Sequence, residues 1–309
     1  MNLLSINDIE AHQFKEILEL AHHIKVYPEY CTNVLKGKML VLYFEKPSTR
    51  TRLSFEAAMK QLGGHALFFD IPNSHLGKGK EDLRDTAQVI AQYADIIAAR
   101  VYKNETLEKI ASYVEIPVIN ALSDKEHPCQ ALADVLTILE HKGKTAKVAY
   151  VGDGNNVCNS LALACAKLGI SITVSCPPGY EPAATVSVVR DPAEAVQDAD
   201  VVYTDVWVSM GNEHEAKQRE KDFMPYQVDA ALMERAKPGA IFMHCLPAVK
   251  GSEVSADVIE GPQSVVLQQA ANRLHVQKAL LLLLNETAGK RESACAPAQF
   301  VSTGESYDW

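Results

Sequence analysis

Apolar residues along the chain occur in two kinds of pattern, which follow one another in turn. Continuous apolar runs of strand length, such as 38–44, are followed by stretches with apolar residues every three or four positions, as in 50–62. Strands are predicted at 38–44, 65–70, 94–101, 116–122, 147–151, 170–176, 185–191, 200–206 and 240–246. Helices are predicted at 5–25 with Ser5 as its cap, then at 50–62, 85–93, 106–114, 128–142, 155–168, 192–199, 228–237 and 273–285.

Strands that alternate with helices predict parallel sheets, and so an α/β fold. At 309 residues the chain exceeds the usual size of one hydrophobic core. We therefore predict two domains, 1–134 and 135–285, each a parallel sheet flanked by helices, the second doubly wound and Rossmann-like. The helix at 273–285 is expected to pack back on the first domain, and the aperiodic segment 286–309 to form a flexible tail.

One connection conflicts with this pattern. Only the eight residues 177–184 separate two predicted strands, whereas a parallel crossover needs about a dozen residues or more. Either one of the two runs is not a parallel strand, or the connection has been shortened.

Composition and charge narrow the function classes. The net charge of −9 removes the electrostatic attraction on which general nucleic-acid binding depends. No apolar run approaches the length of a membrane span, and Asp8 and Glu10 stand where a signal peptide needs an apolar core. Seven cysteines form no pairing or zinc pattern and the histidines are scattered, so we expect a cytoplasmic protein without a metal.

The strongest candidate for a site follows the first predicted strand and opens a helix: Pro47-Ser48-Thr49-Arg50-Thr51-Arg52. Free backbone N–H groups at a helix start, together with hydroxyls and a guanidinium that can fork onto phosphate, create an anion site. Arg52 stands one turn before Glu56, so it is either part of that site or a structural ion pair.

Further candidates lie at helix starts and strand ends. His127 and Gln130 open the helix at the domain junction. The loops 205–211 and 244–247 follow strands, and the carboxyl ends of strands are where open α/β sheets bind ligands. Gly152-x-Gly154 also follows a strand, but Val157 replaces the third glycine of a dinucleotide fingerprint, which weakens an NAD interpretation without removing it.

Taken together, the motifs resemble the carbamoyltransferase family, and within it the branch that uses ornithine. In order they are PSTRTR with SFE after it, HPCQALAD, VGDGNN, DVWVSMG, HCLPA and the Ala-Asn-Arg of 271–273. The similarity covers about residues 1–286, and the Ser-Met-Gly loop separates this branch from relatives that use other amines.

The resemblance implies transfer of the carbamoyl group of carbamoyl phosphate to the δ-amine of L-ornithine, in a homotrimer without a cofactor. It assigns the carbamoyl phosphate site to Ser48, Thr49, Arg50, Thr51, Arg100, His127, Gln130, Cys245, Leu246 and Arg273, with His75 from a neighbouring subunit. It assigns ornithine to Asn156, Asp205, Ser209 and Met210, and catalysis to Arg100, His127, Asp205 and Cys245. In this family the site lies between the two domains.

Three departures from the family pattern stand out. Ala271 replaces a residue that is usually acidic, and the link after Tyr180 is short, which suggests a lost surface helix. The segment after about Glu286 matches no motif of the family. Three alternatives remain open at this point: a different amine acceptor such as putrescine or an acylated ornithine, an NAD-linked oxidoreductase, and a binding protein that has kept the fold without the activity.

Overall fold

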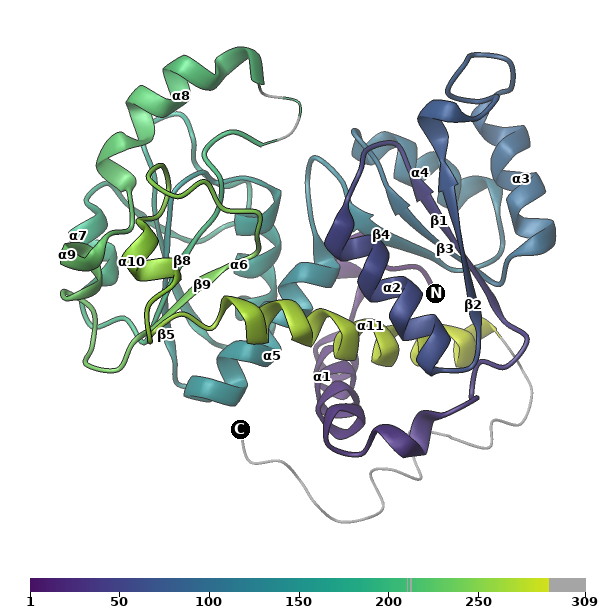
Figure 1. The fold of residues 1–309 in the computed structure, drawn as a ribbon, viewed down its shortest axis with the longest axis horizontal. Coiled ribbons are helices and arrows are strands. Elements are labelled where there is room, and N and C mark those ends of the chain that lie inside the picture. Colours follow the sequence, from purple (N-terminus) through teal and green to yellow (C-terminus); the bar gives the residue numbers. More distant parts are fainter. Residues whose placement is uncertain (210, 212, 289–309) are drawn as a thin grey trace. The chain divides into compact units, whose positions relative to one another are not determined.

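The computed structural model describes residues 1–209, 211 and 213–288. They form two compact units, the first built from Met1–Leu132 together with the described residues from Arg273 onward, the second from Ala133–Asn272. Each unit is an α/β body with its own parallel sheet, as the alternation of strands and helices predicts (Figure 1). Within the described residues no helix combines the length and the apolar content needed to cross a membrane.

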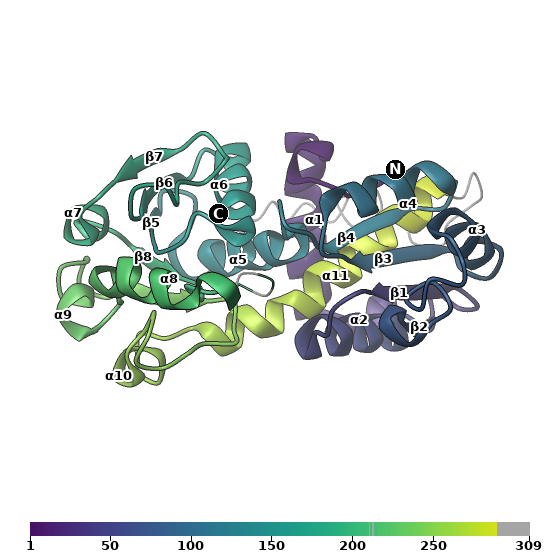
Figure 2. The ribbon, with the colours of Figure 1, turned by 90° about the horizontal axis from the view of Figure 1, so that it is seen from above.

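Unit 1 contains a four-stranded parallel sheet in the order β2-β1-β3-β4, whose strands run side by side in Figure 2. Its strands are β1 (Met39–Phe44), β2 (His65–Asp70), β3 (Ile96–Arg100) and β4 (Val118–Leu122). Its helices are η1 (Ile6–Asp8), α1 (Ala11–Val26), η2 (Pro28–Cys31), α2 (Thr49–Gln61), η3 (Ile71–Asn73), α3 (Leu83–Tyr93) and α4 (Asn104–Tyr113).

Chain order reverses direction across this sheet between β1 and β3. From β1 the chain passes through α2 to β2 on one side, and then returns to β3 on the other side of β1. A parallel sheet opens a crevice at such a switch point, beyond the carboxyl ends of its strands. The segments that follow β1 and β3 therefore lie where unit 1 is built to bind a ligand.

Unit 2 contains a five-stranded parallel sheet in the order β7-β6-β5-β8-β9. Its strands are β5 (Lys147–Val151), β6 (Ser171–Ser175), β7 (Ser187–Val189), β8 (Val201–Thr204) and β9 (Ile241–His244). Its helices are α5 (Pro128–Lys142), whose first turn belongs to unit 1, α6 (Asn156–Leu168), α7 (Pro192–Val196), η4 (Glu213–Glu215), α8 (Ala216–Phe223), η5 (Met224–Tyr226), α9 (Ala230–Met233) and α10 (Ala256–Ile259). Here the switch point lies between β5 and β8.

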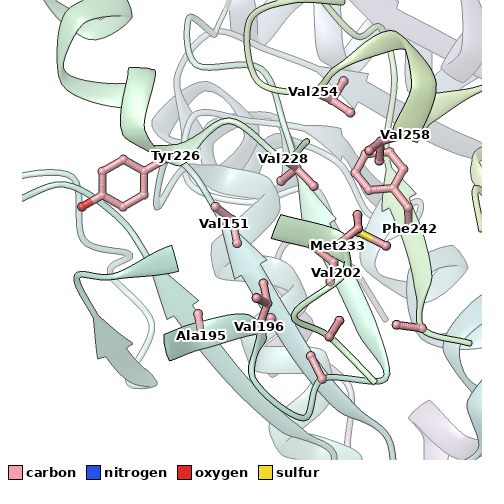
Figure 3. Packing of buried hydrophobic residues seen from close by; sticks show 14 of the residues in the cluster. Val151, Ala195, Val196, Val202, Tyr226, Val228, Met233, Phe242, Val254 and Val258 are labelled. Carbon is pink, nitrogen blue, oxygen red and sulfur yellow. The ribbon is translucent and has the colours of Figure 1, made fainter. Parts of the chain in front are cut away.

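An apolar core covers one face of this second sheet. Figure 3 shows side chains of β5, β8 and β9, among them Val151, Val202 and Phe242, packed against residues of α7, α9 and the following loops. Burial of such side chains contributes about 1.5–3 kcal/mol each. The core thus fixes the strand ends that carry the candidate residues of unit 2.

The short connection proves to be a shortened parallel crossover. β6 and β7 are parallel neighbours, and residues 176–186 between them contain neither helix nor strand. Arg190 closes this link, because its guanidinium donates to the backbone oxygens of Cys176 (3.0 Å) and Pro177 (3.3 Å) and pairs with Glu181.

Helix boundaries differ from the sequence predictions at several places, and the sequence analysis does not predict α8 and α10. Ser5 caps the short helix η1 through the N–H of Asn7, and α1 begins separately at Ala11. The last helix, α11 (Val266–Ala288), starts seven residues before the predicted Arg273, because Val265 and Val266 are buried and extend the apolar face backward. It also includes residues 286–288, so the predicted tail begins too early; residues 289–309 lie outside the described part.

Candidate active site

The start of α2 presents the predicted anion site of unit 1. Ser48 is the N-cap, and its side chain accepts a hydrogen bond from the N–H of Thr51 at 3.3 Å. Thr49 and Arg50 occupy the first helical positions, where backbone N–H groups have no partner within the helix. The positive end of the helix adds to the attraction for an anion.

A single guanidinium gathers the buried polar side chains beside this helix start. Arg273 of α11 is 2% exposed and donates to Thr51 Oγ1 at 2.9 Å and to Gln130 Oε1. Its Nη1 also lies 3.4 Å from Nε2 of His127. Ala271 is exposed, and the three contacts orient Arg273 without an acidic residue there.

His127 is buried among positive charges, which decides its protonation state. Burial, followed by the charges of Arg273, Arg100, Lys46 and Arg50, lowers the pKa of His127 well below its usual value. The ring is therefore neutral near pH 7. Since arginine can only donate, Nε2 facing Arg273 acts as the acceptor and Nδ1 carries the proton. Four cations around one neutral imidazole form a site for an anion.

Lys46 belongs to this cluster although the sequence analysis does not select it. It is the second residue after β1, is 6% exposed, and its ammonium lies 5.1 Å from the centre of the Tyr102 ring. Its place just after a strand at the switch point is a signal that sequence analysis can use. Arg100, at the end of β3, is likewise buried.

Arg52 and His75 lie outside the cluster. Arg52 pairs with Glu56 at 2.8 Å, and its guanidinium lies 4.0 Å from the centre of the Phe68 ring, so the structural interpretation of Arg52 holds. His75 is exposed on the loop before α3, and in the described part of unit 1 no hydrogen bond joins its side chain to the cluster.

In unit 2, Asp205 at the end of β8 is the centre of a second group. The thiol of Cys245 donates to Asp205 Oδ1 at 3.0 Å, and the amide of Asn155 donates to Oδ2 at 2.8 Å. Asn155 also caps α6, where its oxygen accepts from the N–H groups of Val157 and Cys158. Sequence analysis selects the neighbouring Asn156, the first residue of α6, and misses Asn155.

The other predicted ornithine residues follow β8. Ser209 is half-buried, two residues beyond Trp207. Met210 lies outside the described residues. Asp205, which follows β8, therefore meets Asn155, which lies between β5 and α6, at the switch point of this sheet.

The loop after β9 carries Cys245 and Leu246, and a buried pair supports it. Leu246 has a left-handed backbone (φ 58°), and its N–H donates to Nδ1 of His244 at 2.9 Å. Nε2 of His244 lies 3.1 Å from Glu253 Oε1, and both side chains are fully buried. Glu253, like Lys46 and Asn155, is a residue that sequence analysis does not select.

Asp205, His244 and Cys245 place three potential metal-ligand atoms within 4.8 Å of one another, a group that the sequence analysis does not foresee. Nδ1 of His244 already accepts a hydrogen bond, so Nε2 carries the proton that it gives to Glu253. Neither ring nitrogen then offers a lone pair to a metal. We assign the group to hydrogen bonding.

The glycine pattern of 152–154 has an explanation that needs no dinucleotide. A Cβ at Gly154 would lie 2.2 Å from the backbone nitrogen of Pro182 and 2.5 Å from the carbonyl oxygen of Tyr180. The turn is therefore packed against the shortened link of its own unit. Gly154 makes room for that packing, which removes the main support for the NAD interpretation.

Comparison with known proteins agrees with this geometry. Two family models match, the carbamoyl-P binding domain of aspartate/ornithine carbamoyltransferase over residues 1–140 and the Asp/Orn binding domain over residues 144–284. The ornithine carbamoyltransferase of Carboxydothermus hydrogenoformans is 49% identical over 302 residues, 92% of this chain and 97% of that protein. The anabolic ornithine carbamoyltransferase of Pyrococcus furiosus is 50% identical, over 92% and 96%.

Solved structures match equally well. The ornithine carbamoyltransferase of Pyrococcus furiosus superposes with a TM-score of 0.85 at 49% identity, over 91% of this chain and 95% of that one. The anabolic enzyme of Campylobacter jejuni gives a TM-score of 0.87 at 39% identity, over 93% and 99%. With both domain models matched in order along the chain, this protein belongs to the aspartate/ornithine carbamoyltransferase family.

Proposed function

We propose that the protein transfers the carbamoyl group of carbamoyl phosphate to the δ-amino group of L-ornithine, giving L-citrulline and phosphate, in arginine metabolism. The observation that carries this is the convergence of Arg50, Arg100, Arg273 and Lys46 on a neutral His127. The matched domain models and the names of the relatives support the same reaction.

The electrophile binds to unit 1. The phosphate group is held by the start of α2, through Ser48, Thr49, Arg50 and Thr51. Arg100, His127, Gln130 and Arg273 surround the carbamoyl group. This division follows the chemistry of the groups, because hydroxyls, N–H groups and a fork suit phosphate whereas buried donors suit a carbonyl.

Charge on the carbamoyl oxygen grows as the amine attacks, and unit 1 supplies donors for it. The neutral His127 can donate from Nδ1, and Thr51 keeps its hydroxyl proton because its oxygen accepts from Arg273. Together with Arg100 they form an oxyanion hole, in which loss of one donor typically costs about 10²–10³ in turnover. Arg50 and the helix start stabilise the departing phosphate.

The nucleophile binds to unit 2. An alkyl ammonium has a pKa near about 10.4, so forming the neutral δ-amine at pH 7 costs about 4–5 kcal/mol. Asp205 holds two of its hydrogen bonds to Asn155 and Cys245 and is oriented by them. Asp205 and Cys245 orient the δ-amine and assist its deprotonation, while Leu246 lies beside it; Asn156, Ser209 and Met210 hold the α-amino and carboxylate ends.

Citrulline formation from carbamoyl phosphate and ornithine tests this function, with Arg50→Ala as the inactive control. Putrescine, acetylornithine and aspartate are assayed beside ornithine, since the family also uses other amines. If one of these amines is carbamoylated and ornithine is not, that amine is the acceptor in place of ornithine. If none of the four amines is carbamoylated, the enzymatic interpretation fails.

Assembly as a homotrimer is part of the proposal, with His75 reaching the site of a neighbour from its exposed loop. Light scattering gives the mass of the assembly. His75→Ala and Arg50→Ala chains, each inactive alone, are expected to regain about a quarter or less of the activity when refolded together. Absence of any recovery would place His75 in its own site. No disulfide joins the six described cysteines, and this supports the reducing cytoplasm as the proposed location.

A further inference from the structure

Asp153 is a buried acid that the proposed reaction does not use. It stands in the turn after β5, in the glycine pattern first compared with a dinucleotide fingerprint, and is 6% exposed. Its Oδ2 accepts a hydrogen bond from Nη1 of Arg219 at 2.8 Å. Both side chains are about nine-tenths buried, so this ion pair is poorly screened by solvent.

Arg219 connects Asp153 to the segment that follows β8. The same Nη1 donates to the backbone oxygen of Trp207 at 3.2 Å, and Nε donates to Glu215 Oε2 at 2.9 Å. The guanidinium carbon lies 4.9 Å from the centre of the Tyr180 ring, on the shortened link. One side chain thus ties the β5 turn, the segment after β8 and the start of α8 together.

The hydrogen bond from Arg219 to Trp207 connects this network to the proposed substrate site. It lies midway between Asp205 and Ser209, the two residues proposed to bind ornithine. Its indole stacks on Phe223, with ring centres 6.2 Å apart. A hydrogen bond to the carbonyl at this position fixes the direction of the main chain toward both neighbours, and groups held in this way bind at lower entropic cost.

We propose that Asp153 is a positioning residue for the ornithine side of the site: through Arg219 it fixes the main chain at Trp207, and loss of the Asp153 charge weakens this interaction. This proposal rests on the proposed function, because the expected consequence of the positioning is a higher affinity for ornithine. Asp153 itself touches no reacting group.

Burial and surrounding charges make the ion pair of Asp153 with Arg219 sensitive to pH. Burial raises the pKa of Asp153 to about 6; Arg219 opposes this rise, and the negative charges of Asp205 and Glu215 add to it. Arg219 stays charged, since its pKa is raised. The other ionisable groups that interact with Asp153, which have raised pKa values and stay neutral, are Tyr150, Cys158 and Cys176. Between pH 7 and pH 5 the charge of Asp153 therefore changes. His214, whose Nε2 lies 3.6 Å from Oε1 of Glu215, is another titratable group beside Arg219, and Asp153→Asn separates the two contributions.

Fluorescence of Trp207 reports this change without any substrate. The chain has two tryptophans, so Trp309→Phe leaves Trp207 as the only one. We expect an emission change with its midpoint at about pH 6, as the pKa of Asp153 requires. The change should be absent from Asp153→Asn in the same background and retained by Asp153→Glu. Asp222→Asn is the matched control, because Asp222 lies on α8 and binds Tyr180 (3.1 Å) rather than Arg219.

Steady-state kinetics tests the positioning role. At pH 7.5 Asp153→Asn should raise KM for ornithine about tenfold, equivalent to about 1.4 kcal/mol, with kcat and KM for carbamoyl phosphate nearly unchanged. The KM ratio of variant to wild type should fall toward unity at pH 5, where the wild-type carboxyl is also protonated. Protonation of ornithine itself affects KM of the variant and of the wild type equally, so it cancels in the ratio of the two KM values.

Two results would overturn the proposal: an emission change that persists in Asp153→Asn, or a KM ratio that is the same at pH 7.5 and pH 5. A third result would also contradict the proposal. If Asp153→Asn lowers kcat and raises KM for both substrates to a similar degree, the role of Asp153 is merely structural. If the wild type forms no citrulline, the proposed function fails, and the fluorescence titration still decides whether Asp153 controls Trp207.

Discussion

Arg273 contributes to the unit 1 site from a position far from every other member of it in the sequence. It contacts Thr51, Gln130 and His127, and no motif around those three residues indicates that an arginine from α11 will join them. The fork geometry of arginine explains the choice, because two nitrogens must reach different partners at once. A point charge on a flexible stem would satisfy only one of them.

Arg273→Lys is therefore expected to lower kcat/KM for carbamoyl phosphate by about 10²–10³, since a donor is lost and two partners are misplaced. Arg52→Lys is the matched control, because the ion pair of Arg52 with Glu56 is half-exposed and changes activity little. Steady-state kinetics with carbamoyl phosphate as the varied substrate measures both. Similar losses for the two variants would contradict the assignment of Arg273.

At the scale of elements, α11 carries polar side chains that differ in how well they are satisfied. Gln269 accepts from the N–H of His244 (3.0 Å) and donates to Asp134 and Tyr203. Gln277, two turns further, is fully buried, and neither amide atom has a hydrogen-bond partner in the described part of the chain. The same residue type is therefore a structural link at one position and an energetic cost at the other.

Replacing each glutamine with methionine, which has a similar shape, should change stability in opposite directions. Gln277→Met is expected to raise the free energy of unfolding by about 1–3 kcal/mol, because it removes an unsatisfied buried amide. Gln269→Met should lower it by a similar amount, since the N–H of His244 and Oδ1 of Asp134 each lose the hydrogen bond that Gln269 makes with them. Denaturant unfolding measures both; a loss in Gln277→Met would show that its amide is satisfied.

At the scale of the whole molecule, the two groups of candidate side chains lie in different units. The cations that face His127 all belong to unit 1, including Arg273, which α11 returns to it from the end of the described chain. Asp205, Asn155 and Cys245 all belong to unit 2. The overall charge of −9 is thus opposite in sign to the charge of the cations around His127.

Binding of the two substrates should separate along this division. In calorimetry, Asp205→Asn is expected to leave the Kd for carbamoyl phosphate within about twofold of the wild type, because Asp205 makes its contacts in unit 2. Arg50→Ala should weaken the same binding by about tenfold or more, as a lost charge-assisted contact is worth about 1.5–3 kcal/mol. A large effect of Asp205→Asn would mean that carbamoyl phosphate also depends on unit 2.

Local patterns in the sequence determine the strands, most of the helices and the phosphate loop, because apolar spacing, caps and strand ends act within a few residues. They also carry the family resemblance. The shortened crossover, the true start of α11 and the roles of Asn155 and Gly154 were decided only by the tertiary structure. The ties of Arg273 to Thr51 and of Arg219 to Asp153 join positions far apart in the chain, and such contacts depend on packing that no local pattern contains.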